Sequence, residues 1–178
     1  MLGNNSTAGH SDAPAEIGFA MGCFWGVQRL FDSLEQVVLT TVGYMGGTLP
    51  SPTYEQVCRG QSGHAETIWV TYRGDVAELI TVFFENHDPT QGDRQGNDIG
   101  SQYRSMIFPT TQAQATCAAK LAERYATALS ARGFGPITTE IATVGAHRFW
   151  PAEQWHQKYL EKNPGGYCPV HATGVCLA

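Results

Sequence analysis

The chain has 178 residues, of which 42% are hydrophobic and 15% are charged, and its formal net charge is -5. This length and composition are typical of one globular domain that can bury its own core. The acidic balance argues against a nucleic-acid or anionic-membrane surface, and no apolar run reaches the roughly 20 residues of a membrane span. We therefore expect no nucleic-acid or membrane partner, and we also expect a monomer.

Residues 1–15 are mostly small and polar, and they lack the basic start and apolar centre of a signal peptide. We expect a disordered tail there, a single domain over residues 16–160 and a mobile C-terminal segment over residues 161–178. The five cysteines form no compact even framework, which is typical of a reducing compartment. The protein is therefore expected to be cytoplasmic.

One cysteine lies between the first two predicted elements. Residues 17–21 form an apolar run that predicts a buried strand, and the apolar spacing over residues 27–34 predicts an amphipathic helix. Cys23 stands at their junction. The unpaired N–H groups of a helix N-terminus favour an anion, so we expect a lowered thiol pKa and a thiolate ready to attack. A small buried hydrophobe is the alternative role for such a cysteine.

The β-branched and aromatic residues over 37–44 predict a second strand. Ser51 followed by Pro52 is typical of a helix N-cap and first turn, and this short helix would carry Tyr54 and Cys58.

The third predicted strand, residues 65–72, carries a carboxyl group on its apolar face. Glu66 shares the period-2 face with Ile68, Val70 and Tyr72. Burial there would raise the pKa of Glu66 and leave an acid able to donate a proton near neutral pH. The alternative is that Glu66 lies at the strand end and reaches water.

The second half of the chain continues the alternation of elements. Residues 88–102 show no hydrophobic period, and a loop of that length is usually functional or disordered. The other patterns predict a helix capped by Asp75, a strand over residues 103–108, a helix from Thr111 to about residue 131, a strand over residues 137–144 and a short helix over residues 152–160. This order predicts an α+β fold of the split β-α-β (ferredoxin-like) type, with a mixed sheet covered by helices and an irregular C-terminal tail.

Two further cysteines, Cys168 and Cys176, lie in the glycine-rich tail. A thiolate that takes oxygen from a substrate becomes a sulfenic acid, which a second thiol converts to a disulfide. Exchange can then pass that disulfide to a third thiol. Cys23 on a rigid junction with two cysteines on a tail therefore suggests a thiol relay.

A series of motifs recurs in order over roughly residues 16–178: Gly22-Cys23-Phe24-Trp25-Gly26, Pro52-Thr53-Tyr54, Gly63-His64-Ala65-Glu66, Asn86-His87-Asp88-Pro89, Arg94-Gln95-Gly96-Asn97-Asp98, Gln102-Tyr103-Arg104-Ser105 and Lys162-Asn163-Pro164. In this series the chain resembles the A type of peptide methionine sulfoxide reductase. Its ending resembles the three-cysteine subset that thioredoxin recycles. Met21 departs from the pattern, because many members have a glycine there.

The resemblance implies that Cys23 attacks the sulfur of methionine (S)-sulfoxide, free or in proteins, and that protonated Glu66 faces the sulfoxide oxygen. Tyr54 and Tyr103 would also hydrogen-bond to that oxygen. A neutral acid with phenol donors suits this reaction, because negative charge builds on the oxygen.

The remaining implied roles concern the methyl group and the recycling of the enzyme. Phe24 and Trp25 would pack against the S-methyl group, and Asp98 would help to order the site. Cys168 and then Cys176 would resolve the sulfenic acid. Thioredoxin or another dithiol would supply the electrons, with no cofactor and no metal.

Two other functions remain open. Cys23 could act with a histidine base in acyl transfer, the candidates being His64, His87 and His156. Cys168, His171 and Cys176 could belong to a structural zinc site, although their spacing fits no common zinc motif.

Overall fold

The computed structural model describes residues 13–167 and 171–177, so Cys168 and nearly all of the expected N-terminal tail lie outside the described residues. The main elements are β1 (Ala15–Met21), α1 (Phe24–Asp32), β2 (Val37–Met45), α2 (Tyr54–Cys58), β3 (Ala65–Tyr72), α3 (Val76–Glu85), β6 (Ser105–Pro109) and α4 (Gln112–Ala131). Shorter elements are β4 (Arg94–Gln95), β5 (Asp98–Ile99), a 3₁₀ turn (Ser101–Tyr103), β7 (Glu140–Ile141), β8 (Trp150–Pro151) and α5 (Tyr159–Lys162).

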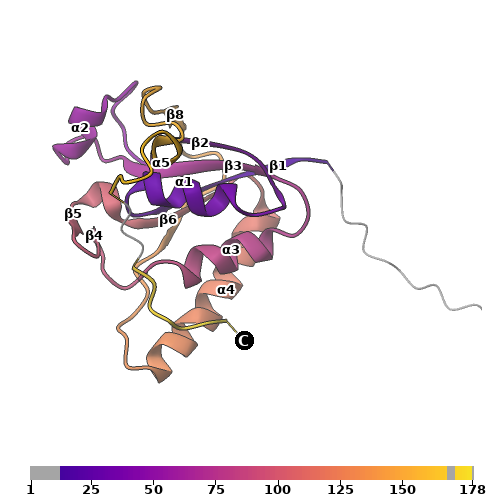
Figure 1. Ribbon diagram of the computed structural model, residues 1–178. Coiled ribbons are helices and arrows are strands. Elements are labelled where there is room, and N and C mark those ends of the chain that lie inside the picture. The colour runs from indigo at the N-terminus through magenta and orange to yellow at the C-terminus, as the bar shows by residue number, and fades with distance from the viewer. Residues whose placement is uncertain (1–12, 168–170, 178) are drawn as a thin grey trace, which may run out of the picture.

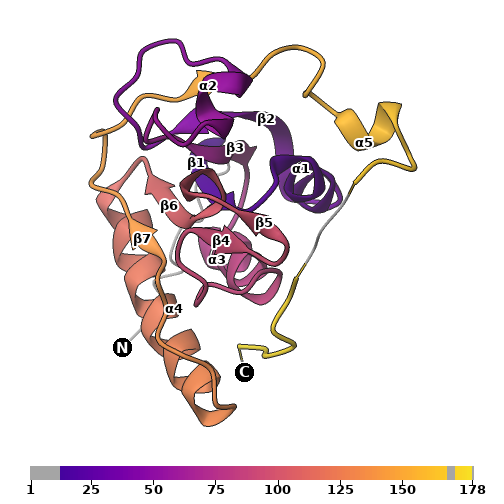
Figure 2. The same ribbon diagram turned by 90° about the vertical axis from the view of Figure 1, so that its left-hand side faces the viewer.

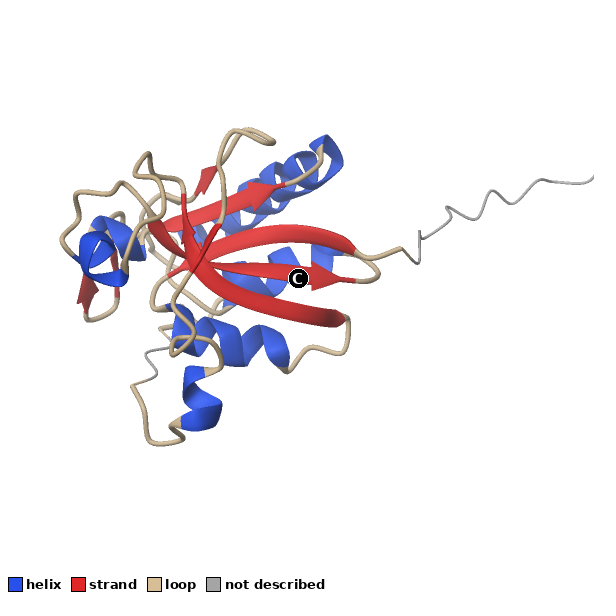
Figure 3. Ribbon diagram, turned by 90° about the horizontal axis from the view of Figure 1, so that it is seen from above, coloured by secondary structure: helices blue, strands red, loops and turns tan. Residues whose placement is uncertain are grey.

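A six-stranded sheet in the order β7-β6-β1-β3-β2-β8 runs through the middle of the molecule (Figures 1 and 3). Its central strands pair antiparallel, while β7 pairs parallel with β6, so the sheet is mixed. The order β6-β1-β3-β2 is the one that two interleaved β-α-β units produce. The expected split β-α-β, α+β fold is confirmed.

The main core lies between the sheet and the helices. Phe19 on β1 stacks between Phe31 of α1 and Phe83 of α3, with ring centroids 5.1 and 5.3 Å apart, and all three rings are fully buried. Full burial of one such side chain contributes roughly 1.5–3 kcal/mol. A smaller cluster on the opposite face of the sheet includes Ala20, Met106 and Phe108. The alternation along β1 therefore fixes which residues face the helices and holds the end of the strand rigid at Met21.

The expected caps of α3 and α4 are present, and that of α2 is displaced. Asp75 caps α3, and Thr111 with Gln114 forms a capping box on α4. For α2, the capping box is formed by Thr53 and Gln56, so the expected cap at Ser51 is wrong. Ser51 has a φ of +48°, whereas an N-cap residue has an extended backbone and its side chain accepts from an N–H group of the first helical turn.

Three expectations for the second half are wrong in detail. Tyr103 ends the 3₁₀ turn, and β6 begins only at Ser105. The strand expected over residues 137–144 is reduced to the two residues of β7, after which the chain crosses to pack Ala142 and Phe149 on the smaller cluster. The long loop over residues 88–102 contains the β4–β5 pair, which its composition did not suggest.

The helix expected over residues 152–160 does not form, and only Tyr159–Lys162 is helical. The side chain of Gln157 bonds instead to the backbone N–H and C=O of Val42 on β2, at 3.0 and 2.8 Å. Lys158 adopts a left-handed conformation with a φ of +55°. Contacts with the sheet therefore replace the helical hydrogen bonds in this segment.

Candidate active site

Cys23 is the N-cap residue of α1 and directly follows the end of β1, as the sequence predicts. Its side chain is buried, with 9% of the residue exposed. Gly22 before it has a φ of +99°, and a Cβ atom there would lie 2.8 Å from Cγ of Gln95. Only glycine fits this close approach with this backbone conformation, so the thiol is held at one fixed position.

The pKa of the Cys23 thiol is raised, contrary to the expectation of a resting thiolate. Burial is the largest cause, and the negative charge of Glu66 adds to it. The backbone N–H groups of Trp25 and Gly26 at the start of α1 lower the pKa, but they do not outweigh burial. The thiol therefore keeps its proton in the unliganded protein.

Glu66 lies in the core and does not reach water, with 2% of the residue exposed. The backbone N–H of Phe24 donates a hydrogen bond to its Oε2 at 3.0 Å. Burial raises the pKa of Glu66 to about 8, although this hydrogen bond opposes the shift. The expected buried carboxyl is confirmed, and most of it is protonated at neutral pH. It lies against the first turn of the helix that Cys23 caps.

The other expected polar residues gather around the same carboxyl group. Burial and then interactions that include the charge of Glu66 raise the pKa of both the Tyr54 and the Tyr103 phenol. Asp98 on β5 also acts electrostatically on Cys23, Glu66 and Tyr103. Its Oδ1 accepts a hydrogen bond from the Tyr167 phenol at 3.2 Å, while its buried Oδ2 has no partner among the described residues. The structure thus brings together a thiol, a neutral acid and two neutral phenols.

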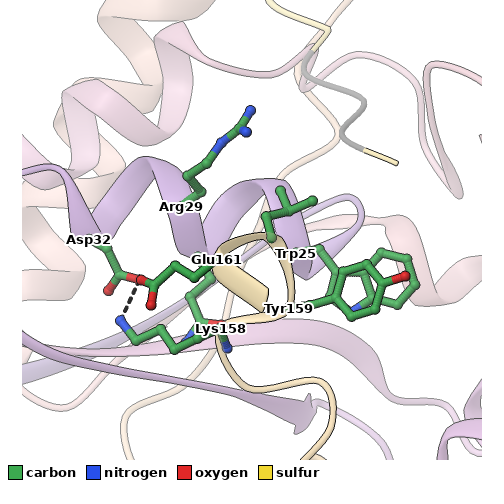
Figure 4. A pocket seen from close by; sticks show the side chains of 8 residues that line it. Trp25, Arg29, Asp32, Lys158, Tyr159 and Glu161 are labelled. Atoms are coloured by element: carbon green, nitrogen blue, oxygen red, sulfur yellow. Dashed lines mark hydrogen bonds and ion pairs between the residues drawn. The ribbon is translucent and has the colours of Figure 1, made fainter. Parts of the chain in front are cut away.

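The two aromatic residues after Cys23 pack in different ways. Phe24 is 1% exposed and packs its ring against Tyr44 and His156. Trp25 is half-buried and stacks on Tyr159 with ring centroids 3.9 Å apart (Figure 4). Its Nε1 donates a hydrogen bond to Nδ1 of His156 at 2.9 Å. Both rings are therefore held by the segment between β8 and the end of α5.

Residues 15–175 match the family model described as peptide methionine sulfoxide reductase. The chain belongs to this family. A relative from Caulobacter vibrioides, peptide methionine sulfoxide reductase MsrA 1, is 54% identical over 159 residues, which cover 88% of this chain and 72% of the relative. Members of the family reduce methionine sulfoxide to methionine, so the chain is an oxidoreductase.

Solved structures agree with this membership. Methionine sulfoxide reductase A of Corynebacterium diphtheriae superposes with a TM-score of 0.83 at 45% identity, covering 92% of this chain and 81% of that one. The reduced form of Mxr1 from Saccharomyces cerevisiae gives 0.80 at 36% identity, covering 93% and 96%. The structure of Mxr1 in complex with Trx2 gives 0.58 at 26% identity, covering 93% and 94%.

The sequence did not predict most of the contacts that hold the aromatic residues of this reductase's site in place. His156 is fully buried and contacts the rings of Phe24, Trp25, Tyr54 and Trp155. Burial lowers its pKa to about 4, so it is neutral and accepts from Trp25. The nearby ion pair between Lys158 and Asp32 fixes the segment to α1 (Figure 4). A histidine and a tryptophan inside a polar stretch were the only signal in the sequence.

The three histidines proposed as partners of Cys23 are engaged elsewhere in the reductase. His64 bonds with the backbone of Gly47 and Leu49, and His87 bonds with Phe83 O and the Ser105 hydroxyl. His156 accepts from Trp25. No hydrogen bond joins any of them to Cys23 among the described residues, so the acyl-transfer alternative has no general base.

The described part of the C-terminal tail is anchored beside α3 and α4 (Figure 2). Val175 is 5% exposed, and its carbonyl accepts from the Tyr125 phenol at 3.1 Å. The backbone N–H of Leu177 donates to Oε1 of Glu85 at 2.5 Å. Cys176 between them is an exposed free thiol. Nothing in the sequence predicts this anchoring.

Residues 13–167 and 171–177 include Met21 and His171, whose surroundings the structure defines. Met21 is buried in the main core, and His171 packs directly over Gly96. No three His, Cys, Asp or Glu residues in these ranges gather as a metal site. No helix in them is long and apolar enough to cross a bilayer.

Proposed function

We propose that Cys23 attacks the sulfur of methionine (S)-sulfoxide, free or in a protein, while Glu66 donates a proton to the sulfoxide oxygen. A bond forms between Sγ of Cys23 and the substrate sulfur. The bond between the substrate sulfur and its oxygen and the new bond between the two sulfur atoms then break as the oxygen passes to Sγ of Cys23, which leaves methionine and a cysteine sulfenic acid. The cysteine is oxidised by two electrons, and the sulfoxide is reduced by two.

The proton balance of this step follows from the two raised pKa values. Both Cys23 and Glu66 hold a proton near neutral pH in the unliganded enzyme. Protonating the sulfoxide makes its sulfur more electrophilic, and ionised Glu66 can then accept the thiol proton. The overall step releases no proton, because the new sulfenic acid retains one.

The other site residues serve the oxygen and the methyl group in this proposal. The phenols of Tyr54 and Tyr103 donate hydrogen bonds to the sulfoxide oxygen as its charge develops. Phe24 and Trp25 pack against the S-methyl group, and Asp98 orders the polar side of the site. A pocket that holds the methyl group and the oxygen on opposite sides accepts one epimer of a chiral sulfur.

Cys168 and Cys176 would regenerate the enzyme. The Cys168 thiol condenses with the sulfenic acid and releases water, and Cys176 takes over the disulfide by exchange. The phenol of Tyr167, directly before Cys168, donates a hydrogen bond to Oδ1 of Asp98 at 3.2 Å, which supports the approach of Cys168 to the site. Thioredoxin then reduces the disulfide, a role supported by the Mxr1 complex with Trx2.

We further infer that residues 16–160 form the catalytic domain and that residues 161–178 carry the recycling cysteines. The enzyme would act as a cytoplasmic monomer and draw its electrons from a dithiol without a prosthetic group. Light scattering of the purified protein tests the monomer, since a mass near 39 kDa, about twice the 19.3 kDa of the chain, would contradict it.

The observation that carries the proposal is the buried, largely protonated Glu66 carboxyl, which bonds to the residue after Cys23. The test is to incubate the enzyme and a dithiol with racemic methionine sulfoxide and to follow both epimers by chiral chromatography and mass spectrometry. We expect one oxygen to be lost from the S epimer alone. Equal consumption of both epimers would contradict the proposed pocket.

A further inference from the structure

Glu153, between β8 and α5, bonds to two elements that border the site. Its Oε1 accepts a hydrogen bond from the backbone N–H of Tyr54 at 2.8 Å, and its Oε2 accepts one from the Tyr44 phenol at 2.8 Å. The same Oε2 lies 3.8 Å from Nε2 of His156. Figure 1 shows α2, β8 and α5 gathered at the end of the sheet where α1 begins.

Each of these three partners leads to a residue of the proposed reaction. Tyr54 begins α2, so its N–H has no partner within that helix. Tyr44 on β2 is paired across the sheet with Glu66. His156 holds the indole of Trp25. One carboxylate thus joins the first residue of α2 to the strand beside the catalytic acid.

The group remains a carboxylate under working conditions. Partial burial opposes ionisation, but the hydrogen bonds from the Tyr54 N–H and the Tyr44 phenol outweigh it and hold the pKa of Glu153 below its usual value. The carboxylate therefore accepts from both donors at neutral pH, and hydrogen bonds to an ionised acceptor are the stronger kind.

We propose that Glu153 is a positioning residue that holds Tyr54 where its phenol meets the sulfoxide oxygen. The inference rests on the proposed function, in which Tyr54 donates to that oxygen. Without the carboxylate, the start of α2 loses its connection to β2, and the phenol is free to shift. A displacement of about 1 Å is enough to slow a positioned chemical step by up to about a hundredfold.

The test is a double-mutant cycle on methionine formation in a single turnover. Glu153→Leu removes both acceptors, Glu153→Gln keeps one carbonyl oxygen, and Tyr54→Phe removes only the phenol oxygen. We expect Glu153→Leu to slow the step about tenfold and Glu153→Gln to slow it less. In the Tyr54→Phe background, Glu153→Leu should have little further effect, because no phenol remains to be displaced.

Two further variants separate positioning from folding and from charge. Glu161→Leu makes the same change on an exposed residue of the same segment, and we expect the parental rate. If Glu153→Leu does not fold, Tyr44→Phe loses only one of the two bonds. Tyr44→Phe should slow methionine formation by a smaller factor than Glu153→Leu does. This effect should also become small in the Tyr54→Phe background. The change should appear in kcat more than in KM for free methionine sulfoxide.

The outcomes separate the positioning role of Glu153 from the proposed reaction in which Tyr54 takes part. If Tyr54→Phe slows reduction and Glu153→Leu either has no effect or multiplies that loss independently, the positioning role is wrong and the reaction scheme stands. If Tyr54→Phe reduces the sulfoxide at the parental rate, Tyr54 has no part in the reaction, and the role of Glu153 is overturned with it.

Discussion

Residues 13–131 and the described residues after residue 137 are built on different principles. The first part holds the long strands and helices α1 to α4, whose apolar residues repeat at the strand or helix period. The described residues of the second part form only β7, β8 and α5, of two to four residues each. It is held by individual contacts, such as Gln157 on Val42, His156 on Trp25 and Val175 beneath Tyr125.

The first part, called the regular part below, and the second part, called the irregular part, contribute differently to the site. The regular part fixes the groups that need exact placement for chemistry, Cys23 at a helix start and Glu66 on a buried strand. The irregular part packs around them and leads into the tail, which carries the exposed Cys176 thiol. Changes in the first part should therefore stop the reduction itself, whereas changes in the second should affect recycling or support.

The largest effect is expected from Glu66→Gln in the regular part. The amide cannot donate an acidic proton, so methionine formation in a single turnover should fall by roughly a hundredfold to ten-thousandfold. In the parent enzyme the rate should also fall as the pH rises through about 8, because Glu66 then loses its proton. Rapid-quench measurements from pH 6 to pH 9 check both. A flat profile in the parent would show that Glu66 is not the acid.

Glu66→Gln should also change how the folding stability depends on pH, and this effect can be measured separately from catalysis. The pKa of Glu66 is raised to about 8 in the folded state from 4.5. The stability that its protonated form contributes is therefore present below about pH 4.5 and is lost as the pH rises through 8. We expect the melting temperature of the parent to fall more between pH 5 and pH 9 than that of Glu66→Gln.

Cys168→Ser, in the second part, should leave the first turnover intact and block the next ones. The sulfenic acid on Cys23 would lack its resolving thiol, so one methionine should form per enzyme molecule and steady-state activity with thioredoxin should be lost. Cys176→Ser is the variant for comparison. Its loss of steady-state activity should be smaller than that of Cys168→Ser if thioredoxin attacks the first disulfide directly. Parental cycling by Cys168→Ser would show that the relay is wrongly assigned.

The two parts also differ in how much of each could be predicted. Periodicity gives the core face of β1 and the place of Cys23, because both depend on residues a few positions apart. Glu66 could be placed in the core because it shares a face with Ile68 and Val70. The conformation of Gln157 and Lys158 could not be predicted, because it depends on β2 and α1, more than 100 residues earlier. The direction predicted for the pKa of Cys23 was wrong, because a position at a helix N-terminus does not show how deeply the thiol is buried.

A smaller effect is expected when the anchor of the second part on α1 is removed. Lys158→Ala loses the ion pair with Asp32 but keeps the strained left-handed backbone, while Lys158→Gly loses the same pair and relieves that strain. The two side chains are partly exposed, so the pair contributes about 1 kcal/mol or less. In urea unfolding, Lys158→Gly should be more stable than Lys158→Ala by about 0.5–1 kcal/mol. If Lys158→Ala were the more stable variant, the left-handed backbone at position 158 would not be strained.

The smallest effect is expected at Cys58, a thiol on α2 to which the proposed relay gives no role. Its side chain is exposed and hydrogen-bonds with that of Tyr54 on the same helix. Serine preserves a hydrogen-bonding group at this position, so Cys58→Ser should keep the parental rate within about twofold. Cys58→Val removes that hydrogen-bonding group. It should slow reduction slightly, because only the hydrogen bond to Tyr54 is lost. Thioredoxin-coupled turnover measures both, and loss of activity in Cys58→Ser would mean that a thiol outside the tail takes part in recycling.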